Sequence, residues 1–539
     1  MKDINDFHSI SPRHVLTIEA DDLTPEQKEY IFLYAQKLCK AGNELTSIMA
    51  RRLHGLYKNH KFNDLKIQYG AIIRKHGKDP KYAKKIKRIV IQLNGYIESY
   101  KLDWESCRKL MQTIAKHYKV NSQLALTKAE DVYTGVEEVL YGKGKHLHYS
   151  DVHKILTMRA KQCNRSIIIY VKNDGIRFKF NKIDFTYKRK PNDIFMNNEL
   201  NNIKLYLSGT SKDYKNHTID NAALNYYNQT GQCLDTFRPC YCMIKCEKIR
   251  GKKRIFIQIM IEGTPITKFT KDGKLRHKLG KGKVGCDIGT QTFAYTSDTE
   301  VGLKNLAERG RSIKKCEQKI CRLNRKLDRS RRSMNPDNFN ENGTCKKGKL
   351  VWHYSNNYKK TVQEFRETHR VSALNRKYAI QEDVNHLREL GDVFITEPKN
   401  AAKLAKKATL DPSKPNKKRK RFGKSIQVRC PGYFQAQCKS KFSEYYEVPS
   451  NYKASQYDHT DQQYKPKDLS VRLYNLSDGS MVQRDWYSSF LLYCCNSIFK
   501  QIDQSQCNTH FSVKHQQQLE LIDQIKAQKI HIKNSGIKI

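Results

Sequence analysis

The hydrophobic period of this chain changes twice within its first 170 residues, and this order of patterns constrains the fold most. "HVLTIEAD" (14–21) alternates at every second residue, as a strand does. "LTPEQ" then predicts a helix start, with Thr24 as cap, Pro25 at the first helical position and Gln27 completing a capping box. Helical patterns continue to about residue 162, and strand patterns return at "SIIIYV" (166–171). The order predicts one β-domain that is interrupted by a helical lobe.

Further strand patterns follow this return. They are "GIRFKFN", "IKLYL" and "YCMIKCEKIRGKKRIFIQIMIEG", the last predicted as two strands around a turn at Arg250–Lys253. Cys240, Cys242 and Cys246 share one parity with Ile244, which is typical of a half-buried strand face rather than of metal ligation.

A third pattern begins at Gly282. "KVGCDIGT" predicts a strand that carries Asp287, and a second apolar alternation follows it. Leu306, Ile313, Ile320 and Leu327 then recur every seventh residue, which favours a two-helix hairpin over a true coiled coil. A polar loop (335–349) separates this helix from a second one that runs to about Leu390.

"DVFITEPKN" (392–400) predicts a short strand that ends on Glu397, and it precedes a strongly basic stretch. The stretch Lys403–Lys424 holds ten Lys or Arg and one acidic residue, Asp411. A run of this kind predicts a solvated loop, whose cations could also bind phosphates.

The charge balance indicates a polyanionic partner. With 101 Lys and Arg against 54 Asp and Glu, the formal net charge is +47, and the excess is spread along all 539 residues. Such a chain repels itself, so nucleic acid is the expected partner, and 31 Tyr and 20 Phe supply rings that can stack on bases. A length far above the ~150 residues of an average domain predicts several domains.

The sixteen Cys residues predict neither disulfides nor a zinc site, because no C-x-x-C pair occurs in the sequence. There is no apolar signal segment and no stretch near the ~18 apolar residues of a membrane span. We therefore expect a protein without membrane contact in a reducing, cytoplasmic compartment, where thiols stay reduced.

Three carboxylates in the last third of the chain are candidates for a metal site. Asp287 lies in mid-strand, Glu397 at a strand end, and Asp485 opens the apolar helix in "VQRDWYSSFLLYCC". Cleavage of a phosphodiester requires hard oxygen ligands for Mg²⁺, often for two ions ~4 Å apart. Each residue could also have a purely structural role, which for Asp485 is N-capping of its helix. Taken together and in this order, the three point to metal binding.

The motifs "GCDIGT", "DVFITEP" and "QRDWYSSFLL", with a helical hairpin after the first, resemble the split RuvC nuclease domain of the TnpB family. These are transposon-encoded RNA-guided endonucleases, from which type V CRISPR effectors descend. The resemblance implies an α/β multidomain, bilobed protein with an RNase H-like RuvC domain. It also implies a β-barrel wedge domain with an inserted helical recognition lobe.

The resemblance further implies the domain boundaries. The wedge domain would comprise 1–23 and 165–282, with the recognition lobe (24–164) inserted. The RuvC domain would comprise 283–450 and 485–510, around a target-nucleic-acid-binding insertion (451–484) and before a C-terminal tail (511–539). Asp287, Glu397 and Asp485 would hold two Mg²⁺ ions, with Asp287 between both. A structured guide RNA would select a double-stranded DNA target by base pairing, and the protein would read a short flanking motif.

One departure from the family concerns zinc. Many relatives carry two C-x-x-C pairs in the insertion, whereas residues 451–484 contain no Cys. Asp458 and His459 alone cannot complete a tetrahedral zinc site. We expect a metal-free loop packed by Tyr452, Tyr457, Tyr464 and Leu476. Cys430 and Cys438 lie in a helical pattern and are interpreted as packing residues.

Two alternatives to a guided nuclease remain at this point. A nuclease-inactive, RNA-guided repressor would be favoured by loss of any of the three carboxylates, and all three are present. An accessory transposase protein that joins strands would need its own chemistry, and no tyrosine or serine recombinase motif is found.

Overall fold

The computed structural model describes residues 13–76, 79–142, 144–172, 175–208, 238–262, 270, 274–307, 311–405, 423–468 and 470–539. By internal contacts the chain forms two compact units, 1–267 and 268–539. The boundary precedes the predicted one at 282 because the residues before strand β9 (Lys283–Ile288) bind the second unit. The Gly280 N–H donates to the Arg388 carbonyl, and the Gly282 N–H donates to the Asp392 carboxylate.

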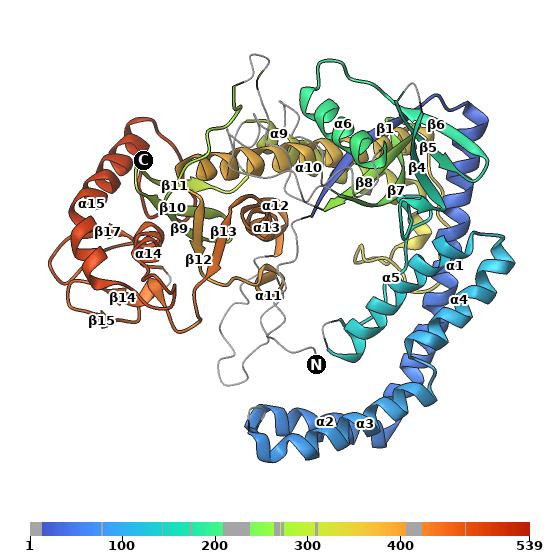
Figure 1. Ribbon diagram of the computed structural model, residues 1–539, viewed down its shortest axis with the longest axis horizontal. Coiled ribbons are helices and arrows are strands. Elements are labelled where there is room, and N and C mark those ends of the chain that lie inside the picture. The colour runs from blue at the N-terminus through green and yellow to red at the C-terminus, as the bar shows by residue number, and fades with distance from the viewer. Residues whose placement is uncertain are drawn as a thin grey trace. The chain divides into compact units, whose positions relative to one another are not determined.

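The first helix of the first unit begins where the sequence predicts. Thr24 caps α1 (Pro25–Lys58) and forms the expected capping box with Gln27. The apolar face of α1 is buried, and α4 and α5 pack against it. The helices that follow α1 are α2 (His60–His76), α3 (Ala83–Ser99), α4 (Trp104–Tyr118) and α5 (Ser122–Leu140). Within this unit, α2 and α3 pair and lie far from the sheet (Figure 1).

The strands of the first unit form an eight-stranded antiparallel sheet over the described residues, in the order β2-β7-β8-β1-β6-β5-β4-β3. The strands are β1 (Arg13–Asp21), β2 (Leu156–Arg159), β3 (Asn164–Arg165), β4 (Ile167–Lys172), β5 (Gly175–Phe180), β6 (Ile183–Tyr187), β7 (Arg238–Ile249) and β8 (Lys252–Glu262). β4 also approaches β7, which is not its neighbour in this order. The predicted barrel is therefore a curled sheet here.

Two predictions for the first unit are wrong. The helical region ends at Leu140 rather than near residue 162, and strand β2 follows it. The segment "IKLYL" lies in α6 (Ile194–Ser208) and not in a strand, since five residues of alternating pattern are too few to separate the two periods. The predicted strand face is confirmed for Cys242, Ile244 and Cys246, which are buried in β7, whereas Cys240 is half-buried at a register shift between Pro239 and Tyr241.

The second unit is built around a mixed five-stranded sheet in the order β11-β10-β9-β12-β13. Its strands are β9 (Lys283–Ile288), β10 (Thr292–Ser297), β11 (Val301–Asn305), β12 (Val393–Thr396) and β13 (Glu444–Glu447). β9, β10 and β11 run antiparallel, whereas β12 is parallel to both β9 and β13. A parallel neighbour requires a long crossover, which the helical hairpin between β11 and β12 provides.

Helices cover both faces of this sheet. Val284, Cys286 and Ile288 of β9 pack with residues of α10 (Asn356–Leu390) and α13 (Pro431–Lys441). Residues of the opposite parity, such as Ala294 and Ile395, pack with α14 (Arg484–Tyr493). β9 is thus an interior strand, which explains its apolar sequence.

The predicted helical hairpin is present as α9 (Arg311–Met334) and α10, which lie side by side (Figure 1). Ile313 and Leu323 are buried, and the polar loop between the helices is confirmed. Leu306 is buried but lies in the turn after β11, outside α9. The predicted heptad pattern therefore begins one repeat before the helix does.

The remaining elements are α11 (Ala401–Ala405), α12 (Gly423–Arg429), β14 (Tyr457–Asp458), β15 (Gln463–Tyr464), β16 (Leu473–Asn475), β17 (Met481–Gln483) and α15 (Gln504–Ala527). α15 packs on β11 and α14, so the boundary expected at 510 falls inside a helix. Most of the basic run, residues 406–422, lies outside the described residues. In the described part of the chain, no helix is both long and apolar enough for a membrane span.

Candidate active site

The pairing of β9 with β12 brings Asp287 and Glu397 together. Cys286 is the register partner of Thr396 in this parallel pair. The next residue along β9 is Asp287, and the residue that directly follows β12 is Glu397. The two carboxylates therefore leave neighbouring strands at the same level.

The parity of β9 decides which face of the sheet Asp287 occupies. Its apolar neighbours Cys286 and Ile288 point to the face covered by α10 and α13. Asp287 alternates with them and shares the face of Gly285, against which α14 packs. The side chain of Asp287 is 13% exposed. A carboxylate within this apolar strand thus points toward α14 rather than into the apolar layer.

Gly285 allows α14 to lie directly on β9. A Cβ atom at this position would stand 2.3 Å from the Tyr493 nitrogen and 2.4 Å from the Ser489 oxygen. Thr296 of β10 and Ser489 also share a hydrogen bond of 2.9 Å. This close approach fixes the helix whose first turn carries Asp485.

Asp485 does not cap α14. The cap is Gln483, whose side chain accepts a hydrogen bond from the Trp486 N–H at 2.8 Å. The structure therefore removes the simplest structural explanation for Asp485. Its side chain is 17% exposed, and Arg472 approaches one carboxylate oxygen at 3.4 Å.

The charge of Asp287 is close enough to shift the pKa values of the other two carboxylates. Burial, followed by the charge of Asp287, raises the pKa of Asp485 to about 6. Burial and the charge of Asp287 also raise the pKa of Glu397, although Lys399 and a hydrogen bond from the Ala454 backbone oppose this shift. Mutual repulsion of this kind is a mark of functional carboxylate clusters.

Lys399 is a member of the cluster that sequence reasoning missed. Its ammonium donates to Asp287 Oδ1 at 2.5 Å and also to the Ile288 carbonyl. Burial lowers the pKa of Lys399, but the charges of Asp287, Glu397 and Asp485 outweigh it and raise the pKa overall. The signal was present in "TEPKN", where Lys399 follows Glu397 by two residues.

The donors of this cluster match the chemistry of a Mg²⁺ site, which is built from carboxylate oxygens. Among the residues that the structure describes, no three His, Cys, Asp or Glu side chains lie close enough to hold one metal ion together. The cation in contact with Asp287 is instead the ammonium of Lys399. The site combines a metal-type donor set with a protein cation.

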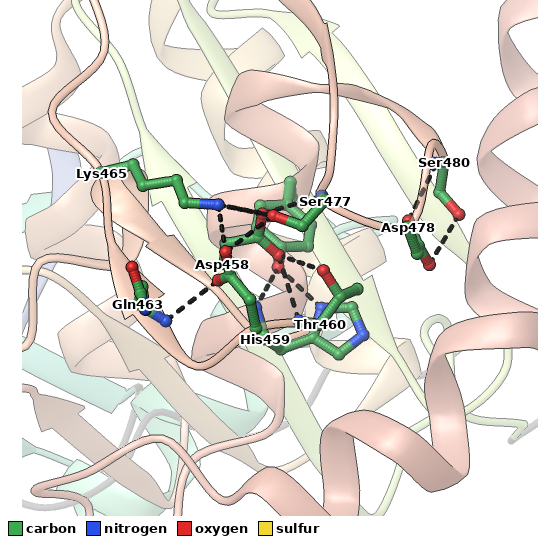
Figure 2. A network of polar contacts seen from close by, with 10 residues as sticks. Asp458, His459, Thr460, Gln463, Lys465, Ser477, Asp478 and Ser480 are labelled. Carbon is green, nitrogen blue, oxygen red and sulfur yellow. Dashed lines mark hydrogen bonds and ion pairs between the residues drawn. The ribbon is translucent and has the colours of Figure 1, made fainter.

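The insertion between β13 and α14 is held by a polar network instead of cysteines, as Figure 2 shows. The buried Asp458 accepts hydrogen bonds from Thr460 N and Oγ1 at 3.1 and 2.7 Å. Its other oxygen accepts from Ser477 N and Oγ at 3.1 and 2.9 Å. Lys465 approaches the same carboxylate at 3.6 Å. Asp458 thus links the β14–β15 hairpin to the loop that follows β16.

The packing predicted for the insertion is confirmed in part. Tyr452 and Leu476 are buried, whereas Tyr457 is half-buried and Tyr464 is 51% exposed. His459 is buried against Tyr487 of α14, with a contact of 2.7 Å between Nδ1 and the hydroxyl oxygen. Cys438 is buried in α13, as expected of a packing residue.

Comparison with known proteins identifies remote structural similarity. No protein-family model and no curated protein matches the sequence. A Cas12f1–sgRNA–target DNA complex is similar at a TM-score of 0.41 and 12% identity, over 88% of this chain and 84% of that one. A Cas12i1 R-loop complex before target DNA cleavage is similar at a TM-score of 0.24 and 10% identity, over 80% and 56% of the two chains. These scores are too low to establish a shared fold.

Proposed function

We propose that this protein is an RNA-guided DNA endonuclease of the TnpB and type V effector kind, with one RuvC-type cleavage site. The observation that carries the proposal is the placement of Asp287, Glu397 and Asp485. These residues come from three elements that are far apart in the sequence. The strand register and the close approach of α14 bring them to one face of the sheet. The order of the mixed sheet supports an RNase H-like domain.

Asp287, Glu397 and Asp485 would hold Mg²⁺, which when bound activates water and stabilises the leaving oxygen of a phosphodiester. Two features of the chain position these carboxylates. β9 and β12 set Asp287 beside Glu397, and Gly285 sets the distance of α14.

The nucleic-acid part of the proposal is supported by charge. A net charge of +47 over 539 residues requires many counterions, which a bound RNA would replace. The motif resemblance assigns that RNA the role of guide and DNA the role of target. The compared Cas12f1 assembly contains an sgRNA and target DNA, which agrees with this assignment.

A guided repressor without cleavage is the alternative function. It is less well supported because Asp485 does not cap α14. The raised pKa values of Glu397 and Asp485 also mean that keeping both carboxylates ionised lowers the stability of the fold, which a binding protein without cleavage does not require.

The test is substitution of each carboxylate by alanine in the RNA-loaded protein. We expect Asp287→Ala to reduce cleavage of a matched DNA target by at least about a thousandfold, on the scale of losing one strong transition-state interaction, with guided binding nearly intact. The matched control is Asp523→Ala, a carboxylate of α15 in the same unit that is 78% exposed and should change neither property. Cleavage by Asp287→Ala at the wild-type rate would remove this residue from the site.

A further inference from the structure

The ammonium of Lys399 is fixed within the carboxylate cluster. It donates both to Asp287 Oδ1 and to the backbone carbonyl of the next residue, Ile288. The Lys399 side chain is 27% exposed and that of Asp287 is 13% exposed, so solvent screens the pair only in part. A lysine held at two points of the same strand has a defined position and is more than a diffuse counterion.

The protein cations at the cluster already hold two of its three carboxylates. Lys399 contacts Asp287, and Arg472 approaches Asp485 at 3.4 Å. The carboxylates contribute three negative charges if all are ionised, and these cations return two positive ones. A divalent ion that reaches Asp287 Oδ1 must therefore displace an ammonium from that oxygen.

We propose that Lys399 is a built-in cation of the cleavage site, which occupies Asp287 in the metal-free protein and competes there with divalent metal ions. The inference deepens the proposed function and rests on it, since it assumes that Asp287 is a metal ligand. Lys399 keeps the carboxylates from repelling one another when metal is absent. The same contact lowers the affinity of the site for the first metal ion.

Two consequences distinguish this role from plain packing. Removal of the ammonium should raise metal affinity, because the competitor is lost. It should also destabilise the metal-free protein, because three carboxylates then share one face without that cation. A lysine with only a structural role would produce the second effect without the first.

The experiment measures binding of Mn²⁺ alone to the full chain, freed of nucleic acid at high salt, by electron paramagnetic resonance and thermal unfolding. Lys399→Met removes the charge and keeps the length of the side chain. We expect Mn²⁺ affinity to rise by about tenfold or more, the metal-free melting temperature to fall, and Mn²⁺ to restore it. Lys399→Arg, which keeps the charge, should remain near wild type.

Two further variants separate the outcomes. Lys283→Met, at the start of β9, loses a lysine that approaches the Cys495 carbonyl at 3.4 Å rather than the carboxylates, so its Mn²⁺ affinity should be unchanged. Asp287→Asn should abolish tight binding. Unchanged or weaker affinity in Lys399→Met, with binding still dependent on Asp287, would overturn the inference alone. Binding that ignores Asp287 as well would contradict the proposed site.

Folding of the variant is itself informative. If Lys399→Met folds only with Mn²⁺ and unfolds on chelation, the inference is supported, since the metal then replaces the ammonium. If it stays unfolded with metal, Lys399→Gln becomes the measured variant, because glutamine keeps a donor for Ile288. Wild-type Mn²⁺ affinity in Lys399→Gln would then overturn the inference.

Discussion

The carboxylate of Asp287 lies in a strand that is covered on both faces, where a buried charge without a partner would cost several kcal/mol. Two features of individual residues make it tolerable. The alternation of β9 directs it to the α14 face, and Lys399 donates to it at 2.5 Å. The same two features form the candidate site, so the contact between Lys399 and Asp287 affects both the stability of the strand and the site.

Gly285 gives the sharpest test at the residue scale. An added Cβ would meet two backbone atoms of α14 at 2.3 and 2.4 Å, and backbone cannot rotate away as a side chain can. We expect Gly285→Ala to destabilise the second unit by about 1–3 kcal/mol or more. Displacement of α14 should also reduce cleavage. Thermal unfolding and a cleavage assay on the same preparation measure both effects.

The control for this prediction is a glycine with free space around it. Gly70 lies in α2, and no atom stands within 4 Å of its added Cβ. Gly70→Ala should stabilise the protein by up to about 1 kcal/mol, since alanine is the better helix former. A Gly285→Ala protein that melts and cleaves like wild type would show that α14 does not need this close approach.

At the scale of elements, a polar network around Asp458 holds the insertion together. Asp458 accepts four hydrogen bonds that connect the β14–β15 hairpin to Ser477. In Asp458→Asn the amide NH₂ faces donors, so buried donors lose their acceptor at a cost of about 1–3 kcal/mol. Urea unfolding should show this loss. Asp478→Asn is the control, because Asp478 is exposed and the hydrogen bonds that it accepts come from the nearby Ser480 among the described residues.

Elemental analysis completes this test. The network predicts that wild-type protein contains no stoichiometric zinc and that chelators do not loosen the insertion. About one zinc per chain, or an Asp458→Asn protein as stable as wild type, would contradict a metal-free insertion.

The hairpin of β10 and β11 is linked to α10 by a pH-sensitive contact between Glu300 and His386. His386 and Tyr295 both approach Glu300 Oε1 at 2.7 Å. The hydrogen bond from His386, followed by that from Tyr295, lowers the pKa of Glu300 to about 2 against the burial that raises it. The stabilisation is thus fully present above pH 4.5, the ordinary pKa of a free glutamate, and is lost as the pH falls toward 2.

Glu300→Gln should therefore be less stable than wild type at pH 7, and the difference should shrink as the pH falls below 4.5. Urea midpoints at pH 7, 5 and 3.5 measure this trend. A difference that stays constant across this range would show that the ionised carboxylate contributes nothing to stability.

Sequence patterns predicted the helices and strands whose hydrophobic pattern is long or regular. The capped start of α1, the strands around Asp287 and Glu397, and the hairpin of α9 and α10 are all present. Short patterns were less informative, and "IKLYL" proved helical. The position of Lys399 two residues after Glu397 is a hint in the sequence, but its contact with Asp287 depends on the register of β12. Arg472 could not be assigned to the site from the sequence, because its contact with Asp485 depends on how the insertion folds.

At the scale of the whole molecule, the net charge of +47 requires compensation. A structured RNA of about 100 nucleotides brings about one negative charge per nucleotide, and its binding releases counterions. We expect the protein to be purified with a discrete RNA at moderate salt and to lose it steeply as salt rises. Heterogeneous RNA without a common scaffold would leave a basic metal-dependent nuclease without a guide.

The most direct test of the central claim combines that RNA with the carboxylate cluster. The segment of the copurified RNA that pairs with DNA is replaced by a new sequence, and cleavage of old and new targets is measured with Mg²⁺, for wild type and Asp287→Ala. The account predicts that wild type cleaves only the new target and that Asp287→Ala binds this target without cleaving it. Cleavage that ignores the RNA sequence, or that persists in Asp287→Ala, would contradict it.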